Sequence, residues 1–499
     1  MSHPINPVLA GFFPDPSVCR VGERYYLANS TFEYFPGLPI HVSDDLVSWT
    51  PLSSAITDVD AFDYPRLRDS KGVYAPSIRF HDGVFYIVCA LVDDGVESGF
   101  IITATDPAGP WSKPVWVREA RGFDPSLFFH EERTYWCAAR TVQPGEYFGQ
   151  TEVWVREIDP TSGEFLGDET VIWDSALRGA TWSEAPHIFE RDGWFYLLTA
   201  EAGTFRDHAV VIGRSRSITG PYENCPRNPI FSHRHLGTEY PVQNVGHADF
   251  VERPDGTWCA VALAVRTIDD KHILGRETFI ADVTWEDDWP VVNAGTGVLL
   301  DVGDRPHDER VEPARLGDAL TIRGAADFVT EVADGIVLTS TGSSVTQHEH
   351  PAALAYRLRH HDAVVSATFG SVDHEAITGL LLRQSTDFSI RLELADARAR
   401  VIRRRDGSDE VVDEWPAPAV GGEITAGSSA RLSAQLSAQL SAQGVRFAVG
   451  DHWSRSTPID VLSTEMAGGF VGTVWGPYVE GAEGATALVS ATEYRGGTA

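Results

Sequence analysis

The chain has 499 residues, of which 43% are hydrophobic and 22% charged, and this composition is typical of a globular protein with two or three domains. Its formal net charge is −31, because 71 acidic residues outnumber 40 lysines and arginines. The negative electrostatic potential of such a protein repels phosphate backbones and anionic lipid surfaces, so we expect neither nucleic acid nor a membrane as a partner.

The start of the chain and its cysteines bear on the compartment. The sequence MSHPINPVLAGFFPDPS has no basic segment followed by a long apolar one, and no apolar run in the chain approaches the roughly 18 residues of a membrane span. The five cysteines lack CxxC spacing, and four of them fall in expected strands: Cys19, Cys89, Cys137 and Cys259. We therefore expect reduced, buried thiols and a cytoplasmic protein.

One phrase occurs five times in the first 295 residues. Each copy runs from a small polar start through an apolar strand and a tight turn into an aromatic strand, as in APHIFERDGWFYLLTA. The copies begin at Asp15, Ala75, Asp124, Ala185 and His247. Asp-Gly pairs at 82–83, 192–193 and 255–256 predict hairpins between the strands.

Between the copies lie further strand-like pieces, such as TEVWVREIDP, so each unit has enough chain for about four strands. Repeated units of this kind are typical of a propeller. The sequence therefore predicts a five-bladed β-propeller over residues 1–295. The stretch 296–319, rich in Gly, Pro and charge, predicts a linker or strap.

The remaining residues, 320–499, have alternating strands without the repeated phrase. This pattern predicts an antiparallel, concanavalin-like β-sandwich. Within it, residues 432–443 read LSAQLSAQLSAQ. We expect this segment to form a short amphipathic helix or a lengthened strand and loop, as a surface expansion without function.

Three copies of the phrase carry a carboxylate at, or just before, the same position: Asp15, Asp124 and Glu184. A ring of equivalent blades would bring the three together at one central funnel. Hydrolysis of a glycosidic bond needs an acid for the leaving oxygen and a base or nucleophile on the opposite face of the sugar. A third negative charge can keep the acid protonated. Taken singly, the two aspartates also fit turn starts, and the glutamate fits an exposed strand edge.

A second group of residues is compatible with either a site or a structural role. His247 fits a hydrogen-bonded core residue, or a contact to sugar hydroxyls or a cation. Arg276 fits a structural ion pair, or a partner of a catalytic carboxylate. Phe32 and Tyr74 fit the core or a stacking surface for a sugar, and Thr204 could line the funnel. The sequence contains no GxSxG, P-loop, GxGxxG or HExxH motif.

The motifs GFFPDPSVCRVGERYYLANSTFEYFPGLPI, WSEAPHIFERDGWFYLLTAEAGT, YPVQNVGHADF and LGRETFIADV resemble glycoside hydrolase family 43. The resemblance is to its β-xylosidase and α-L-arabinofuranosidase branch with a C-terminal β-sandwich, and it covers nearly the whole chain. It implies an inverting, exo-acting enzyme that releases terminal xylose, arabinofuranose or both from xylan-derived oligosaccharides and requires no cofactor. Relatives of this kind also imply a homo-oligomer.

The same resemblance implies roles for single residues. Asp15 resembles the general base that activates water, Glu184 the general acid, and Asp124 the carboxylate that sets the pKa of the acid and orients it. The pocket for one sugar would be formed by Phe32, Tyr74, Thr204, His247, Arg276 and Phe470. Tyr74 stands where β-xylosidases of this branch often have Trp. Some relatives carry a calcium ion on the propeller axis, which would lie near His247.

Two other functions stay open. One is a retaining fructan- or sucrose-cleaving five-bladed hydrolase, whose two carboxyl groups would lie about 5–5.5 Å apart instead of the roughly 6.5–9.5 Å of an inverting enzyme. Asp15 lacks the Asn-Asp-Pro-x-Gly surroundings that we associate with that group. The other is a sugar-binding propeller without catalysis.

Overall fold

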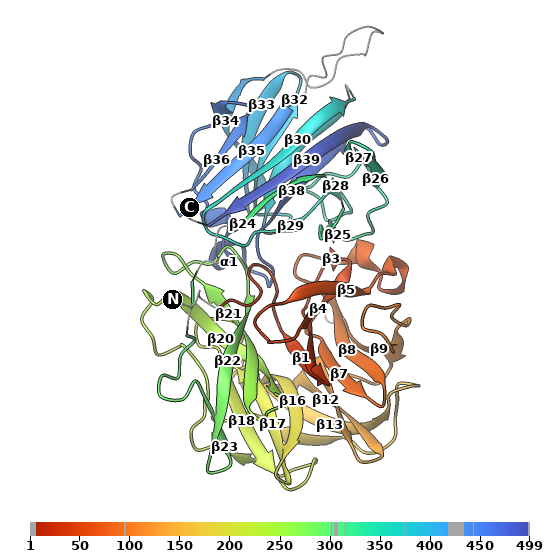
Figure 1. Cartoon of the computed structure of the whole chain (residues 1–499), viewed down its shortest axis with the longest axis vertical. Helices are drawn as coiled ribbons and strands as arrows, with labels where there is room; N and C mark the ends of the chain where they lie inside the picture. The colour runs from red at the N-terminus through yellow and green to blue at the C-terminus, as the bar shows by residue number, and fades with distance from the viewer. Residues whose placement is uncertain are drawn as a thin grey trace.

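The computed structural model describes residues 6–93, 96–300, 302–303, 308–314, 316–373, 375–417, 434–442 and 444–497. Within these residues the protein is built from β-strands, with one short α-helix, α1 (Thr464–Ala467). A propeller lies below a sandwich, with α1 and the two-stranded pair β3–β25 near their boundary (Figure 1). In the described part of the chain, no helix has the length and apolarity to cross a membrane.

Five antiparallel sheets follow one another along the chain as the blades of the propeller, which confirms the predicted fold. Blade 1 contains β1 (Ser17–Val21), β2 (Arg24–Ala28), β4 (Gly37–Ser43) and β5 (Thr50–Ile56). Blade 2 contains β6 (Gly72–Val73), β7 (Ser77–His81), β8 (Val84–Asp93), β9 (Val96–Ala104) and β10 (Val115–Val117). Blade 3 contains β11 (Phe123–His130), β12 (Arg133–Thr141), β13 (Thr151–Asp159), β14 (Glu164–Phe165) and β15 (Thr170–Trp173). Blade 4 contains β16 (Glu184–Arg191), β17 (Trp194–Glu201), β18 (Ala209–Ser215) and β19 (Glu223–Asn224). Blade 5 contains β20 (Val242–Glu252), β21 (Trp258–Arg266), β22 (Glu277–Glu286) and β23 (Trp289–Val292).

The predicted hairpins have the turn geometry that their sequence requires. Asp82 and Gly83 have φ of 47° and 80°, and Asp192 and Gly193 have φ of 51° and 70°. Positive φ at both central residues defines the type I′ turn, whose twist matches that of the two strands it joins. The third pair, 255–256, lies in a longer turn.

Polar side chains from four different blades meet at the centre of the propeller. Asp249 of blade 5 accepts hydrogen bonds from Ser17 Oγ of blade 1 and from Arg79 of blade 2, both at 2.8 Å. Arg79 also lies 2.9 Å from His187 Nδ1 of blade 4. Burial acts to raise the pKa of Asp249, but the charges of Arg79 and His187 and the hydrogen bonds from Arg79 and Ser17 together lower it. These contacts tie the first and last blades together and fill the axis.

The sandwich consists of two sheets. The first has the order β26-β27-β39-β30-β35-β36-β37, with β24 also paired to β39, and the second has the order β28-β38-β31-β32-β33-β34, with β29 paired to β38. The strands of the first sheet are β24 (Asp308–Pro313), β26 (Val329–Val332), β27 (Gly335–Thr339), β30 (Ala363–Val372), β35 (Ala434–Ser441), β36 (Gly444–Val449), β37 (His452–Trp453) and β39 (Thr486–Gly496). Those of the second are β28 (Ala352–Ala353), β29 (Tyr356–Arg357), β31 (Ala376–Arg383), β32 (Ser389–Ala395), β33 (Arg398–Arg405), β34 (Ser408–Pro416) and β38 (Val474–Gly481).

The LSAQ repeat forms a strand, which was one of the two predicted alternatives, but its prediction as a surface expansion was wrong. β35 is an inner strand between β30 and β36, and its leucines and alanines are buried in the sandwich core while the glutamines point outward. The repeat has a period of four in leucine but a period of two in apolar residues, because alanine occupies the alternate inward position. A period of two is the signal of a half-buried strand. Residues 432, 433 and 443 of the repeat lie outside the described residues.

The propeller and sandwich contact each other through backbone pairing as well as side chains. β3 (Tyr34–Phe35), which follows blade 1 strand β2, pairs with β25 (Thr321–Ile322) at the start of the sandwich (Figure 1). The backbone of Arg323 also donates to the carbonyl of Glu33 at 2.9 Å. These contacts join segments almost 290 residues apart, so the two parts form a fixed boundary above the funnel of the propeller.

Candidate active site

In four of the five blades, the repeated position has a left-handed backbone conformation. Asp15, Asp124, Ala185 and His247 have φ of 52°, 52°, 52° and 44°. In blades 3, 4 and 5 this position interrupts the strand register, as a β-bulge does. Bulges re-aim side chains and are frequent beside active sites. In blade 4 the bulged residue is Ala185, and the carboxylate of that blade stands one residue earlier, at Glu184.

Asp15 is buried and held by three side chains. Arg276 donates to its two oxygens at 2.6 and 3.3 Å, from a position just before β22. Ser30 Oγ donates at 2.5 Å, and His247 Nδ1 lies 3.6 Å from Oδ1. A bidentate guanidinium fixes the plane of a carboxylate as well as its charge. Arg276 therefore pairs with a catalytic carboxylate, which was one of its two predicted roles, while the contacts of His247 and Ser30 with Asp15 were not predicted.

A hydrogen bond from the backbone of blade 4 places Asp124 beside Glu184. Asp124 Oδ2 accepts a hydrogen bond of 3.2 Å from the backbone N–H of Ala185. Burial, and then the charge of Asp15, raise the pKa of Asp124 to about 8. Burial, followed by the charges of Asp124 and Asp15, raises the pKa of Glu184 well above its usual value. Carboxyl groups that repel each other in a desolvated site retain protons that free carboxylates release.

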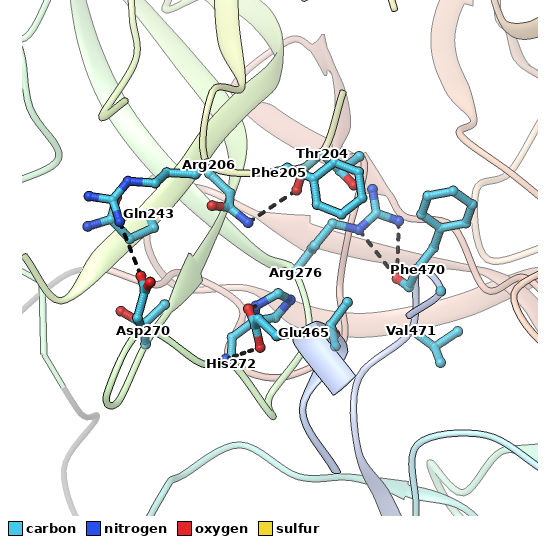
Figure 2. A pocket seen from close by; sticks show the side chains of 14 residues that line it. Thr204, Phe205, Arg206, Gln243, Asp270, His272, Arg276, Glu465, Phe470 and Val471 are labelled. Carbon is cyan, nitrogen blue, oxygen red and sulfur yellow. Dashed lines mark hydrogen bonds and ion pairs between the residues drawn. The ribbon is translucent and has the colours of Figure 1, made fainter. Parts of the chain in front are cut away.

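Aromatic rings from both parts of the protein cover this cluster. Phe470, from the sandwich, stacks on Phe32 with ring centroids 5.8 Å apart, and Tyr74 contacts both rings edge-on at 5.9 and 5.1 Å. The Arg276 guanidinium lies 5.6 Å from the Phe32 ring and 5.5 Å from the Phe470 ring. It also donates to the carbonyl of Phe470 at 3.2 and 3.3 Å (Figure 2). Four of the predicted pocket residues thus form one wall.

A pocket of about 200 Å³ lies beside this wall (Figure 2). It is bounded by loops of blades 4 and 5 and by the sandwich segment around α1, and Thr204, Arg276 and Phe470 are among its lining residues. The three carboxylates are not part of this lining. Arg276 connects the two regions, because the side chain that lines the pocket also holds Asp15.

Ser70 is a residue that the sequence analysis missed. Its backbone N–H donates to Glu33 at 2.9 Å, its Oγ accepts from the backbone N–H of Phe470 at 2.9 Å, and its carbonyl accepts from Tyr74 OH at 3.2 Å. It therefore positions two rings of the aromatic wall at once. Its φ of 59° and its burial agree with a residue fixed by its surroundings.

Behind Ser70 lies a buried ionic cluster between propeller and sandwich. Asp69 accepts hydrogen bonds from Arg323 at 2.5 Å and from Arg383, and Arg383 also lies 3.7 Å from Glu33 and donates to Tyr34 OH at 2.8 Å. Burial and then the charge of Asp69 raise the pKa of Glu33 to about 7, although the two arginines oppose this. No local sequence signal marks this cluster, because its arginines are some 250 to 350 residues from their partners.

The surroundings of His247 do not form a set of protein ligands for a metal. Among the described residues, no group of three or more His, Cys, Asp or Glu side chains has a suitable arrangement. Near His247, Asp15 is paired with Arg276, and on the axis Asp249 is paired with Arg79. Burial lowers the pKa of His247 and so favours a neutral imidazole. The calcium ion stays a prediction, and no step below involves a metal.

Comparisons with known proteins identify the family of this chain. The family model described as glycosyl hydrolases family 43 matches residues 4–290. A xylosidase/arabinosidase of Butyrivibrio fibrisolvens is 47% identical over 59% of this chain, and that alignment spans only 57% of the relative. A non-reducing end alpha-L-arabinofuranosidase of Bacteroides ovatus is 32% identical over 95% of this chain and 91% of its own length.

A solved structure extends the agreement to the whole fold. The xylan beta-1,4-xylosidase of Bacillus halodurans superposes with a TM-score of 0.86 at 26% identity, over 98% of this chain and 99% of that one. The superposition includes the sandwich, which the family model does not reach. Because the family model matches more than half of the chain, and a relative more than 30% identical matches almost all of it, this chain belongs to glycosyl hydrolases family 43 and is a glycosidase.

Proposed function

We propose that this protein is an inverting, exo-acting glycosidase that releases terminal xylose, arabinofuranose or both from xylan-derived oligosaccharides. The observation that carries this proposal is the unequal environment of three converging carboxyl groups. Glu184 and Asp124 have raised pKa values, whereas Asp15 is ion-paired with Arg276. Two carboxyl groups with different environments are what acid–base hydrolysis of a glycoside requires.

Glu184 serves as the general acid. Its protonated form is favoured by burial and by the neighbouring negative charges, so a proton is available for the leaving oxygen near neutral pH. Asp124 contributes one of these charges when it is ionised, and its contact with the N–H of Ala185 fixes its position beside the acid. Once the glycosidic bond breaks, the proton of Glu184 remains on the leaving sugar.

Asp15 serves as the base that takes a proton from water. Arg276 and Ser30 hold its two oxygens, which orients the carboxylate for a water on the opposite face of the sugar. Attack of that water from the face opposite the leaving group gives inversion at the anomeric carbon.

The pentose specificity rests on the relatives. Two curated relatives are named for xylosidase or arabinosidase activities. The five cysteines are buried free thiols, which supports the cytoplasmic location that we also propose.

The test combines substitution of Glu184 with product stereochemistry. Glu184→Gln should reduce kcat on xylo-oligosaccharides by about 10²- to 10⁴-fold, and reduce it far less on aryl pentosides, whose leaving group needs little protonation. Glu164→Gln, an exposed glutamate on β14, is the matched control and should have no effect. Proton NMR of the first-formed product should show the inverted anomer. A retained anomer would assign a nucleophile in place of the base, and an undiminished rate on oligosaccharides would remove Glu184 from the role of acid.

A further inference from the structure

Glu201 is a buried acidic residue that the proposed reaction does not use. It is the last residue of β17 and is 4% exposed. Burial, with a contribution from the charge of Asp174, raises its pKa to about 7, although a hydrogen bond from the N–H of Ala176 and the charge of Arg234 act against this rise. Burying a carboxyl group costs stability unless its hydrogen-bonding capacity is used. The contacts of Glu201 therefore indicate what the residue does.

The carboxyl group of Glu201 holds one side of a single backbone unit. Its Oε1 accepts a hydrogen bond from the N–H of Ala176, and Asn224 Nδ2 donates to the carbonyl of Ala176 at 2.7 Å. Asn224 lies on β19, so the two side chains come from different strands of blade 4. Ala176 is buried. Both of its backbone hydrogen-bonding groups are thus fixed by side chains, and we refer to Glu201 and Asn224 as the loop clamp.

The clamped loop leads to the proposed general acid. Residues 174–183 join β15 to Glu184, the first residue of β16. Ala202, which follows Glu201, donates its N–H to the carbonyl of Thr181 at 2.7 Å. β16 and β17 are neighbours in the sheet of blade 4 (Figure 1). The end of β17 therefore contacts the loop at two points and lies beside the strand that carries the acid.

The backbone on both sides of Glu184 is strained. Trp182 has φ of 51° and Ala185 has φ of 52°, and both values lie in the left-handed region that non-glycine residues rarely adopt. Such conformations persist only where contacts from the surrounding structure impose them. The loop clamp supplies two of these contacts on the N-terminal side of Glu184. Without them, this segment can relax to an ordinary conformation and move the carboxyl group of Glu184.

We propose that Glu201 is a positioning residue for the general acid, because together with Asn224 it holds residues 174–183 in the form that directs Glu184 at the leaving oxygen. Glu201 contacts the backbone of the loop, and it takes no part in proton transfer. This inference rests on the proposed function. A misplacement of about 1 Å in a catalytic group can reduce a rate about 10²-fold, so loss of the loop clamp should slow the step that needs the proton.

The experiment compares two substrates that share the transferred sugar but differ in how much protonation the leaving group needs. Xylobiose needs a proton on its leaving oxygen, whereas 2,4-dinitrophenyl β-xyloside releases a stable phenolate. In Glu201→Ala, the ratio of kcat for xylobiose to kcat for the aryl xyloside should fall about 5- to 50-fold. In Glu201→Gln the amide oxygen still accepts from Ala176, so the ratio should stay within about twofold of the wild type. Glu190→Ala, which removes an exposed glutamate near the far end of β16, is the control and should keep the wild-type ratio.

Two results would overturn the proposal. An unchanged ratio in Glu201→Ala overturns it even if both rates and the Tm fall, since that pattern reflects a structural role alone. An equal fall of the ratio in Glu201→Gln also overturns it, because the acceptor oxygen would then not be what holds the loop. If Glu201→Ala does not fold, Asn224→Ala removes the other half of the loop clamp, and a wild-type ratio in that variant overturns the proposal.

A failure of the proposed function gives a different pattern. If the wild type hydrolyses neither substrate nor the corresponding arabinofuranosides, the proposed function fails. The loop clamp is then tested by amide hydrogen exchange measured by mass spectrometry. Peptides that cover residues 174–184 should exchange faster in Glu201→Ala than in the wild type and in Glu201→Gln. Equal exchange in all three proteins overturns the proposal.

Discussion

Arg276 and Phe470 connect the catalytic carboxylates to the sandwich. The guanidinium that holds Asp15 at 2.6 Å also donates to the carbonyl of Phe470 at 3.2 and 3.3 Å and lies 5.5 Å from its ring. A residue of the C-terminal part therefore helps to fix the side chain that orients the proposed base. This relationship indicates that the propeller alone is an incomplete site.

Ser70 gives a test of that dependence. Ser70→Ala removes the acceptor of the Phe470 N–H, so we expect a looser aromatic wall and an increase in KM of about 2- to 10-fold, the effect of one hydrogen bond. Ser53→Ala is the control, because Ser53 Oγ, on β5 of blade 1, donates to the carbonyl of Pro107 in blade 2, and neither residue lines the pocket. Steady-state kinetics and thermal melts check both variants. Equal KM values with a lowered Tm would show that Ser70 has only a structural role.

Asp124 gives a prediction on the pH dependence of activity. Above its own pKa of about 8, ionised Asp124 raises the pKa of Glu184, so Asp124→Asn should lower the pKa of Glu184. Activity that requires protonated Glu184 is lost as the pH rises through its pKa. The alkaline limb of the kcat profile should therefore move to lower pH in Asp124→Asn and stay in place in the exposed control Asp168→Asn. A limb that does not move would show that Asp124 does not tune the acid.

The same substitution should alter stability with a definite sign. The folded pKa of Asp124 is about 8 and the unfolded value is about 3.9, so the folded state holds the extra proton between these values. The wild type thus loses up to about 1.4 kcal/mol of unfolding free energy per pH unit as the pH rises through this window. Asp124→Asn lacks this loss. In urea unfolding, the difference in unfolding free energy between the variant and the wild type should therefore shift in favour of the variant from pH 5 to pH 8. Parallel changes in both proteins would contradict the raised pKa.

The buried ionic cluster predicts a large cost for removing one partner. Arg383 is 1% exposed. Arg383→Ala leaves the carboxyl groups of Asp69 and Glu33 buried with one positive charge fewer to balance them. We expect a loss of about 3–5 kcal/mol in the free energy of unfolding. Arg398, 55% exposed in its pair with Glu414, is the control and should cost about 0–1 kcal/mol. Similar small losses in both variants would show that solvent reaches the cluster.

The LSAQ repeat can be tested as a core strand. Leu436 is fully buried between the sheets of the sandwich, so Leu436→Ala should destabilise the protein by about 2–5 kcal/mol. Gln439, on the outward face of the same strand, is the control and should tolerate alanine within about 0.5 kcal/mol. Chemical denaturation measures both. Equal tolerance at the two positions would favour the surface expansion expected from the sequence.

The sequence alone determined the propeller and the three carboxylates. Both depend on local patterns: strands and Asp-Gly turns are set by neighbours in the chain, and a repeated unit places equivalent residues at equivalent points of a ring. Asp15, Asp124 and Glu184 could be found because they stand at, or one residue before, one position of the repeat. His247 stands at the same position, and its contact with Asp15 follows from the same symmetry.

Only the tertiary structure decided which residues support that site. Ser70 and Glu33 are positioned by partners in the sandwich, and Arg383 reaches Tyr34 across 349 residues of chain. The sequence also left open which side chains of β35 face the core, since a four-residue repeat is compatible with the period of a helix or of a strand until a neighbouring sheet buries one side. Contacts of this kind depend on how distant segments pack, and no local propensity encodes them.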